Sequence, residues 1–217
     1  MPRALLSSAA ISDFRAQLCA VAERQFAEHG YPGVTLRALA AELGVSAMTP
    51  YRYFRNKEEI FAFVRAAGFR RFADEQVAAS AANRDPLARL AALGRSYLGF
   101  ARREPHAYRI MFEMNPLGTG DGYTELATQQ MRGWQPLQHA VAVAVAAGAL
   151  QGDPEQLAHV YWAAWHGLSS LDLAGTYAFM GQDVDAVAQC LMRTLVTGSQ
   201  PSKRPAHIRA TRRSTRR

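Results

Sequence analysis

Apolar residues recur at three- and four-residue steps through nearly every segment of this 217-residue chain. That step is the period of one face of an α-helix. The stretch 141–145 alternates as a strand does, but both sets of its positions are apolar and it lies inside a longer helical pattern. The spacing therefore predicts an all-α protein of about nine or ten helices, separated by proline, glycine and polar clusters. Those clusters fall at residues 30–33, 83–85, 105, 115–122, 152–154 and 181–183.

Length, composition and cysteine usage narrow the class of protein. The length suits one small unit plus one larger domain, and 49% hydrophobic residues can build a sizeable core. The longest apolar run, residues 140–150, is too short to cross a membrane, and the N-terminus lacks the pattern of a secretory signal. Cys19 and Cys190 stand in apolar helical surroundings and indicate two reduced core thiols. We therefore expect a cytoplasmic protein with no membrane partner.

The N-terminal third shows clear signals for helix ends. A first helix is expected from an N-cap at Ser12 to His29. A second begins at Thr35, whose hydroxyl can cap free N–H groups. Gly44 stands where the chain must turn, a position that often takes positive φ. Asn56 then caps a further long helix and has a glutamate three residues later, as in a capping box.

The stretch 44–59 completes the pattern of a helix-turn-helix. Ser46 can cap a short second helix over residues 46–54, which would be the recognition helix. Pro50 removes an N–H that would bond the Ser46 carbonyl. Either the first turn tolerates this loss, or the helix begins at Thr49 and Pro50 as cap and first position. The stretch predicts a DNA-binding element in both cases.

Charge is divided unevenly along the chain. Residues 1–71 hold ten basic and six acidic side chains, residues 72–198 hold eight and twelve, and residues 199–217 hold seven and none. A basic front end on an acidic body fits a DNA-facing head on a body turned away from DNA. The last segment lacks apolar periodicity, which predicts a disordered basic tail, either a solvated end or an arm that attracts DNA.

Several linked motifs follow one another without gaps between Phe14 and Phe61. They are Phe26-Ala27-Glu28-His29-Gly30-Tyr31, Val34-Thr35-Leu36-Arg37-Ala38-Leu39-Ala40, Gly44-Val45-Ser46, Tyr51-Arg52-Tyr53-Phe54 and Asn56-Lys57-Glu58-Glu59. Their order resembles the tetracycline-repressor (TetR) family of transcriptional regulators. The resemblance covers roughly the first quarter of the chain. It implies an N-terminal three-helix helix-turn-helix DNA-binding domain, followed by a helical-bundle ligand-binding and dimerisation domain.

The resemblance also divides the chain. It implies a short arm over residues 1–11, the DNA-binding domain over 12–71, the ligand-binding and dimerisation domain over 72–198, and the basic tail over 199–217. Within the body, the segments 108–113 and 163–168 are similar to a subgroup of TetR C-terminal domains named for its Trp-His-Gly (WHG) motif.

Family positions carried onto this chain predict a DNA surface around the second helix. Ala47, Met48 and Thr49 would lie against base edges, where the two apolar side chains favour thymine methyl groups. Tyr51 and Tyr53 would donate hydroxyls to phosphate oxygens. Thr35 would reach a phosphate from the start of the preceding helix, and Lys57 from the start of the next, where the helix dipole also favours an anion. Arg37 and Arg52 would contact phosphates or bases. The predicted DNA-binding set is Thr35, Arg37, Ser46, Ala47, Met48, Thr49, Tyr51, Arg52, Tyr53 and Lys57.

The last two long helices carry apolar seams. From spacing alone, these seams fit an intramolecular core and the surface of a homodimer equally well. One recognition helix reads too few bases for useful specificity, so binding of a near-palindromic double-stranded operator favours the dimer. The predicted interface comprises Leu157, Tyr161, Ala164, Leu168, Leu171, Val184, Val187, Leu191 and Leu195.

Aromatic and sulfur-containing side chains concentrate in residues 97–180. Most of them are expected in the core. The resemblance implies that some line a pocket for a small, mostly apolar effector whose identity the sequence does not reveal. Effector binding would favour a body shape that spaces the two heads wrongly for DNA. The candidates are Tyr108, Met111, Phe112, Trp134, Trp162, Trp165 and His166.

Motifs of other chemistries are missing from the sequence. We find no phosphate-binding glycine loop, nucleophile elbow or paired-carboxylate motif. No histidine or cysteine spacing is typical of a metal site, and no cofactor is indicated. The sequence therefore predicts a ligand-responsive homodimeric repressor that is not an enzyme. The alternatives are a non-specific DNA-binding protein without an effector and an enzyme of unrecognised type.

Overall fold

A computed structural model describes residues 8–114 and 121–201, and every regular element within these ranges is helical. The predicted all-α class is confirmed. Most of the predicted arm, of the 115–122 cluster and of the basic tail lies outside the described residues. The elements are α1 (Ser8–Gly33), α2 (Leu36–Glu42), the 3-10 helix η1 (Pro50–Arg52), α3 (Lys57–Ala81), α4 (Pro86–Arg103), α5 (Pro105–Phe112), α6 (Asp121–Ala146), α7 (Pro154–Leu173), α8 (Thr176–Phe179) and α9 (Val184–Gly198).

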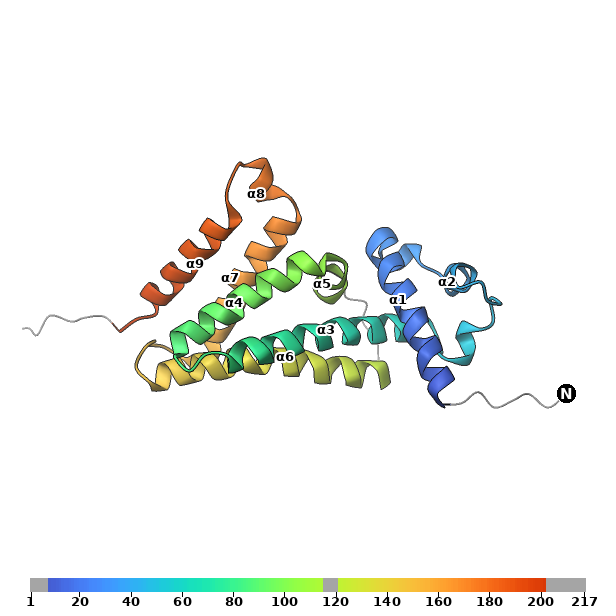
Figure 1. The fold of residues 1–217 in the computed structure, drawn as a ribbon, viewed down its shortest axis with the longest axis horizontal. Coiled ribbons are helices and arrows are strands. Elements are labelled where there is room, and N and C mark those ends of the chain that lie inside the picture. Colours follow the sequence, from blue (N-terminus) through green and yellow to red (C-terminus); the bar gives the residue numbers. More distant parts are fainter. Residues whose placement is uncertain (1–7, 115–120, 202–217) are drawn as a thin grey trace, which may run out of the picture.

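The head of the molecule consists of α1, α2, η1 and the first turns of α3, and it lies at one end of an elongated body (Figure 1). Its core is formed by apolar side chains that these elements turn toward one another. Leu18, Phe26, Leu39 and Phe61 are completely buried. The rings of Phe26 and Phe61 meet edge to face with centroids 4.9 Å apart, an arrangement that aromatic pairs prefer.

The first helix begins earlier than predicted and is interrupted where predicted. α1 already includes Ser8, so Ser12 is not its N-cap. Ala9 and Ala10 precede Ser12, and alanine is the best helix former, so nothing there stops the helix. At the other end the helical backbone is interrupted at Gly30, whose φ is 70°, as predicted, and a further helical turn follows before Gly33.

The other predicted ends in the head are confirmed. The Thr35 hydroxyl accepts the Ala38 N–H at 3.1 Å and caps α2. Gly44 has a φ of 66°, which a glycine adopts without steric cost. The Asn56 side chain accepts the Glu59 N–H at 2.9 Å and caps α3. Gly44 and Asn56 thus stand at the two ends of the segment that joins α2 to α3.

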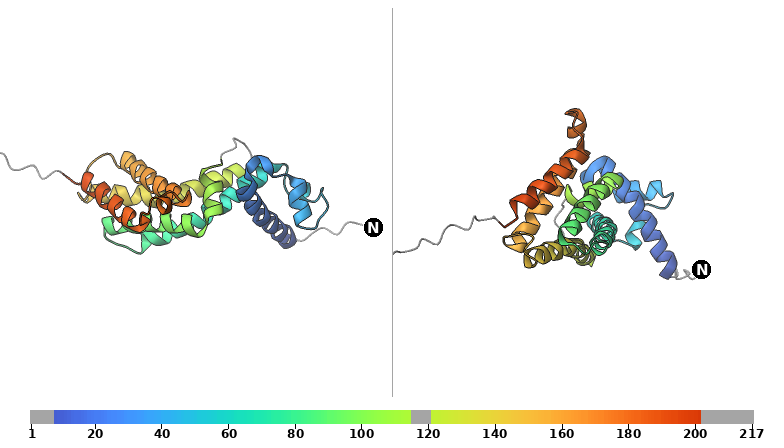
Figure 2. Two further views of the ribbon diagram at one scale, coloured as in Figure 1. Left: turned by 90° about the horizontal axis from the view of Figure 1, so that it is seen from above. Right: turned by 60° about the vertical axis from the view of Figure 1, so that its left-hand side comes forward.

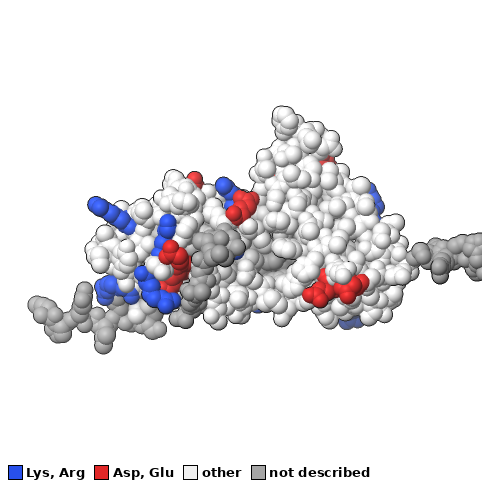
Figure 3. Space-filling model, turned by 180° about the vertical axis from the view of Figure 1, so that it is seen from behind, with Lys and Arg blue, Asp and Glu red and all other residues white. Residues whose placement is uncertain are grey.

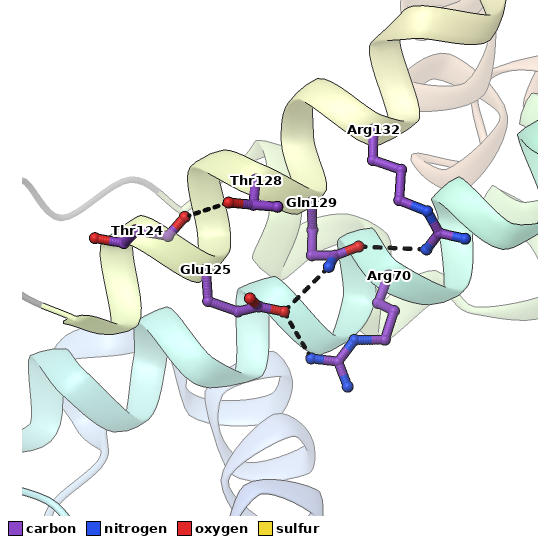
Figure 4. Close-up of polar contacts among 6 residues, drawn as sticks. All are labelled: Arg70, Thr124, Glu125, Thr128, Gln129 and Arg132. Carbon is purple, nitrogen blue, oxygen red and sulfur yellow. Dashed lines mark hydrogen bonds and ion pairs between the residues drawn. The ribbon is translucent and has the colours of Figure 1, made fainter.

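The body is a bundle in which α3 and α6 lie side by side and α4 and α7 pack beside them (Figures 1 and 2). Polar contacts join α3 and α6 on their outer side (Figure 4). Arg70 donates to a Glu125 carboxylate oxygen at 2.8 Å, and Gln129 donates to the same oxygen at 3.1 Å. The Arg70 hydrogen bond lowers the pKa of Glu125. The pair is solvent-exposed, so its contribution to stability is small.

The head is joined to the body by a shared helix and by contacts from α1 and α5. α3 runs unbroken through the predicted domain boundary between residues 71 and 72. The Arg71 guanidinium donates to Glu23 of α1 at 2.9 Å and to Glu104, just before α5, at 3.0 Å. Ile110 of α5 is buried in the head core. The position of the head therefore depends on α3 and α5.

The last helices are the least buried part of the body. α9 packs along α7, and none of its residues is buried. α8 lies between them at a tip that projects from the body (Figure 2). Cys190 on α9 is exposed rather than in the core, because only one side of this helix is packed. Cys19 on α1 is half-buried, and burial raises the pKa of its thiol to about 12. None of the described helices combines the length and apolarity needed to cross a membrane.

Candidate DNA-binding surface and ligand cavity

The segment between α2 and α3 does not form the predicted α-helix over residues 46–54. It forms tight turns that end in the single turn of η1. Because Pro50 has no N–H, the Ser46 carbonyl accepts the Thr49 N–H at 2.8 Å, three residues ahead instead of four. Thr49 is the N-cap of η1 and Pro50 its first residue, as in the second of the two alternatives. Pro50 is also buried, so its ring anchors the segment to the head.

Most of the predicted DNA-contacting side chains lie on the surface of the head. Met48 is 68% exposed and Tyr51 is 53% exposed, although both are large and partly apolar. Tyr53 is half-buried, and its ring lies 4.4 Å from the ring of Phe14. Exposed members of the predicted set are Thr35, Arg37, Ser46, Ala47, Met48, Tyr51 and Arg52, and half-buried members are Thr49, Tyr53 and Lys57.

Lys57 stands at the start of α3 and is held in place by the end of α1. Its ammonium donates to the Tyr31 carbonyl at 2.9 Å and lies 4.3 Å from the centre of the Tyr31 ring. The Tyr31 hydroxyl donates to Glu58 at 2.8 Å. The Glu58 backbone N–H and this hydroxyl both lower the pKa of the Glu58 carboxyl. An ammonium has three donors, so Lys57 can keep the Tyr31 carbonyl and still bind a phosphate.

Basic side chains gather at the head. On the face shown in Figure 3, Lys and Arg lie mainly over the head, beside acidic groups, whereas most of the body surface is uncharged. Not every arginine there is available to DNA. Arg15 lies between the rings of Phe54 and Phe63, at 4.7 and 4.5 Å from their centres, and so packs against the head core. This role was not predicted from the sequence.

The body contains a cavity of about 410 Å³, partly open to solvent, between α3, α5, α6 and α7, here named the α3/α6 cavity. Five of the seven predicted ligand residues line it. The volume lies in the range of small-molecule sites, and aromatic side chains form much of the wall. The lining residues are Arg65, Phe69, Phe72, Gln76, Tyr97, Met111, Phe112, Gln130, Met131, Gly133, Trp134, Leu137, His159, Trp162 and Trp165.

The other two predicted ligand residues form a polar group behind this wall. The Tyr108 hydroxyl is 2.7 Å from His166 Nδ1, and the Tyr97 hydroxyl is 3.2 Å from the same nitrogen. The His166 ring also meets the ring of Phe112, with centroids 5.1 Å apart. Burial lowers the pKa of His166, so its neutral form is favoured. This group connects α4, α5 and α7 and reaches the cavity through Tyr97 and Phe112.

Sequence reasoning missed the α3 side of the cavity. Arg65, Phe69, Phe72 and Gln76 repeat at four-, three- and four-residue steps, so they lie on one face of the helix. That spacing was visible in the sequence, but a core stripe and a cavity wall have the same pattern. Arg65 is buried at one end of this face, where its guanidinium donates to the Met111 carbonyl at 2.8 Å.

The structure divides the predicted dimer residues into three groups by their burial. Tyr161 and Leu168 are buried within the protomer, because α7 turns them toward α4 and α6, so they are core residues rather than surface residues. Leu171 is exposed. The remaining predicted residues, Leu157, Ala164, Val184, Val187, Leu191 and Leu195, are half-buried.

Comparisons with protein families match both parts of the chain. Residues 18–64 match the family described as bacterial regulatory proteins, tetR family, and residues 90–195 match the tetracyclin repressor-like C-terminal domain. The predicted helix-turn-helix domain with a helical body behind it is thereby confirmed. None of the curated proteins gives a significant match.

Solved structures share the fold over most of the chain. A protein of unknown function from Rhodococcus sp. RHA1 is 26% identical, with a TM-score of 0.75, and the match covers 93% of this chain and all of that one. A tetR-family regulatory protein from Rhodococcus RHA1 is 18% identical, with a TM-score of 0.70 over 90% and 98% of the two chains. The regulator FadR from Bacillus subtilis, solved with stearoyl-CoA, is 15% identical, with a TM-score of 0.69 over 84% and 98%.

Proposed function

We propose that this chain, which belongs to the TetR family of DNA-binding transcriptional regulators and is not an enzyme, is a homodimeric repressor controlled by a ligand. In this proposal, a small and mostly apolar ligand enters the α3/α6 cavity and releases the two heads from a near-palindromic operator. Trp165, His166 and Gly167 of α7 would place the body in the WHG subgroup. The repressor would act in the cytoplasm.

One observation carries the proposal: the helices that line the cavity also hold the head. On α3, Phe61 lies in the head core and Phe69 lines the cavity, about two helical turns further on. On α5, the consecutive residues Ile110 and Met111 belong to the head core and the cavity wall. A ligand that displaces Met111 would therefore move Ile110 as well, and the head would shift with it.

The class of ligand follows from the lining. Aromatic and apolar side chains dominate the wall, and a few polar groups such as Gln76 and Tyr97 can orient a ligand. The FadR regulator was solved with stearoyl-CoA, a ligand that carries a long apolar chain. At 15% identity that likeness extends to the fold alone. The ligand class proposed for this chain therefore depends on its own cavity.

On the DNA side, we propose that phosphate contacts provide most of the affinity. Thr35, Tyr51 and Lys57 stand at or near helix starts around the turn segment and would contact the backbone. The side chains nearest the bases, Ala47 and Met48, offer apolar surface and no side-chain donor, so direct reading of base edges would be limited. Specificity would then depend on the spacing of the two heads across both half-sites.

We assign the dimer interface to α7 and α9. Along α9, Leu191 and Leu195 remain half-exposed in the protomer, and a second copy would cover them. The projecting tip extends this surface, because Phe179 is 92% exposed and Met180 is also largely exposed. A symmetric dimer places the same patch on both subunits, as an isologous interface requires.

Intrinsic fluorescence can test the ligand step directly. The chain has three tryptophans, and Trp134, Trp162 and Trp165 all line the cavity. Dodecanoate serves as an apolar probe. We expect it to change the tryptophan emission saturably and, at the same concentrations, to weaken binding to a labelled operator found by footprinting the DNA next to the chain's own gene. Saturable binding to the protein without any effect on operator affinity would contradict ligand-controlled release.

A separate measurement tests sequence-specific binding. Operator and random DNA of the same length are titrated at physiological salt. A specific repressor keeps a preference of roughly a thousandfold or more for its operator, whereas a purely electrostatic binder loses both affinity and discrimination as salt rises. Equal affinity for both DNAs would favour the non-specific alternative.

A further inference from the structure

A second hollow lies on the other side of α4. It has a volume of about 680 Å³, is partly open to solvent, and lies between α4, α7 and α9; it is named the α4/α9 groove. At one end the Arg102 guanidinium donates to Asp185 of α9 at 2.8 Å and to Asp172 of α7 at 2.7 Å. The groove is lined by Ala91, Gly94, Arg95, Leu98, Gly99, Arg102, Trp165, Leu168, Asp185, Ala188, Gln189, Leu191, Met192 and Arg193.

Trp165 borders both the groove and the α3/α6 cavity. Its side chain is buried and fits tightly between α4 and α9. A Cβ placed on Gly94 would lie 2.9 Å from the indole, closer than real contacts allow, so the indole occupies the space that a side chain at position 94 would need. The indole N–H also donates to the Met192 sulfur at 3.1 Å. The ring is therefore fixed from both sides.

We propose that Trp165 is the end wall that limits the length of the ligand, and that the ligand class is straight-chain and apolar. This inference rests on the proposed ligand site in the α3/α6 cavity. The wall on α3 runs from Arg65 to Gln76, so the cavity extends along that helix for roughly 16 Å. An elongated chain follows such a path better than a compact molecule does. Where the cavity borders the groove, the Trp165 indole separates the two hollows.

The consequence is a change in length selectivity when the wall is removed. While an added methylene is buried, affinity rises about fourfold. In the wild type this gain stops when the chain reaches Trp165. In Trp165→Ala the cavity joins the groove, and a longer chain can continue past Gly94 toward Ala188 on α9. The groove is lined largely by apolar atoms, so the added methylenes are still removed from water.

The test measures dissociation constants of octanoate, dodecanoate and hexadecanoate, each below its critical micelle concentration. Emission from the remaining Trp134 and Trp162 reports binding in the variant. We expect octanoate to bind wild type and Trp165→Ala within about threefold of each other. Hexadecanoate should bind Trp165→Ala at least tenfold more tightly than it binds the wild type. Because truncation of a buried indole destabilises a fold, Trp165→Phe is measured too and should show a smaller gain.

A substitution in the groove tests whether the longer chain enters the groove or only fills an enlarged cavity. Ala188 lines the groove but not the cavity. Ala188→Phe alone should leave octanoate binding unchanged, and in the Trp165→Ala background it should abolish the gain for hexadecanoate. Trp134→Ala enlarges the cavity away from the groove, so any gain it gives should be insensitive to Ala188→Phe.

Each outcome decides the question. Octanoate binding to the wild type without a gain for hexadecanoate in Trp165→Ala overturns the inference and leaves the proposed ligand site standing. A gain that survives Ala188→Phe also overturns it, because the chain would then lie elsewhere. If no member of the series binds any of the folded proteins, the inference fails together with an apolar ligand in the cavity.

Discussion

Replacing Tyr51 by phenylalanine removes a single hydroxyl from the head. The side chain is 53% exposed, and among the described residues its hydroxyl has no hydrogen-bond partner. The change should therefore alter the free energy of unfolding by less than about 0.5 kcal/mol. A hydroxyl that donates to a phosphate contributes about 1.5 kcal/mol at the lower end for bonds to charged groups. Operator affinity should then fall about tenfold for each head that binds DNA.

The proposed dimer makes this prediction sharper. On a full operator both heads bind, so the expected loss doubles to about 3 kcal/mol, or roughly a hundredfold. On a half-site, one head binds and the loss is about tenfold. Both DNAs are titrated by fluorescence anisotropy at one fixed salt concentration, and thermal unfolding is followed in parallel. Tyr53→Phe is measured beside it, because Tyr53 belongs to the same predicted set of phosphate contacts but has a half-buried ring that packs on Phe14.

Two results would refute this reasoning. Unchanged affinity on the full operator would remove Tyr51 from the set of phosphate contacts. Equal losses on the full operator and the half-site would show that the two heads do not bind equivalently, which contradicts the symmetric dimer. A loss of stability in Tyr51→Phe would instead show that the hydroxyl has a partner within the protein.

Three further predictions address the body. Burial lowers the pKa of His166. Between that pKa and about 6.5, the unfolded chain therefore binds more protons than the folded chain, and the free energy of unfolding should rise with pH. Urea unfolding at a series of pH values should show this rise in the wild type and not in His166→Gln. Phe179→Ser should weaken dimerisation in sedimentation experiments and leave protomer stability unchanged, because the ring is 92% exposed, whereas Val77→Ser on α3 should affect neither. Gly94→Ala should lower the free energy of unfolding by roughly 1–3 kcal/mol through overpacking against Trp165, and an unchanged denaturation midpoint would show that the indole shifts freely.

The sequence was sufficient to predict the features that depend on contacts within a few residues. The cap at Thr35, the turn at Gly44 and the cap at Asn56 depend on side chains that bond backbone groups within a few residues. The recognition segment was harder, although its signal is local too. Pro50 allowed two arrangements, and the choice depended on whether its ring could be buried against the head, which is a tertiary contact.

In the body, residue spacing alone could not predict which side chains line a cavity and which form the core. Phe69 and Phe72 have the spacing of core residues, and the same spacing also suits a cavity wall. Whether these residues form a core or a cavity wall depends on how closely α6 and α7 approach α3. Residue spacing within one helix does not determine that distance. Tyr161 and Leu168 illustrate the same problem at the surface: their seven-residue spacing predicts a packed face, but the partner proved to be the protomer itself rather than a second copy.

The arrangement of α3 and α5 supplies the route by which the proposed ligand signal would reach the head. Ile110 is buried in the head core, and Met111, the next residue, lines the cavity. In a close-packed interior a short helix cannot move at one residue and stay in place at its neighbour. In the proposed mechanism the ligand and the operator favour different positions of the same helix, and each then weakens the binding of the other by the same factor. Saturating operator should then raise the dissociation constant of a cavity ligand, and Met111→Ala, which removes the cavity contact of α5, should reduce the factor of this increase. An undiminished factor in the folded variant would exclude α5 as the common element.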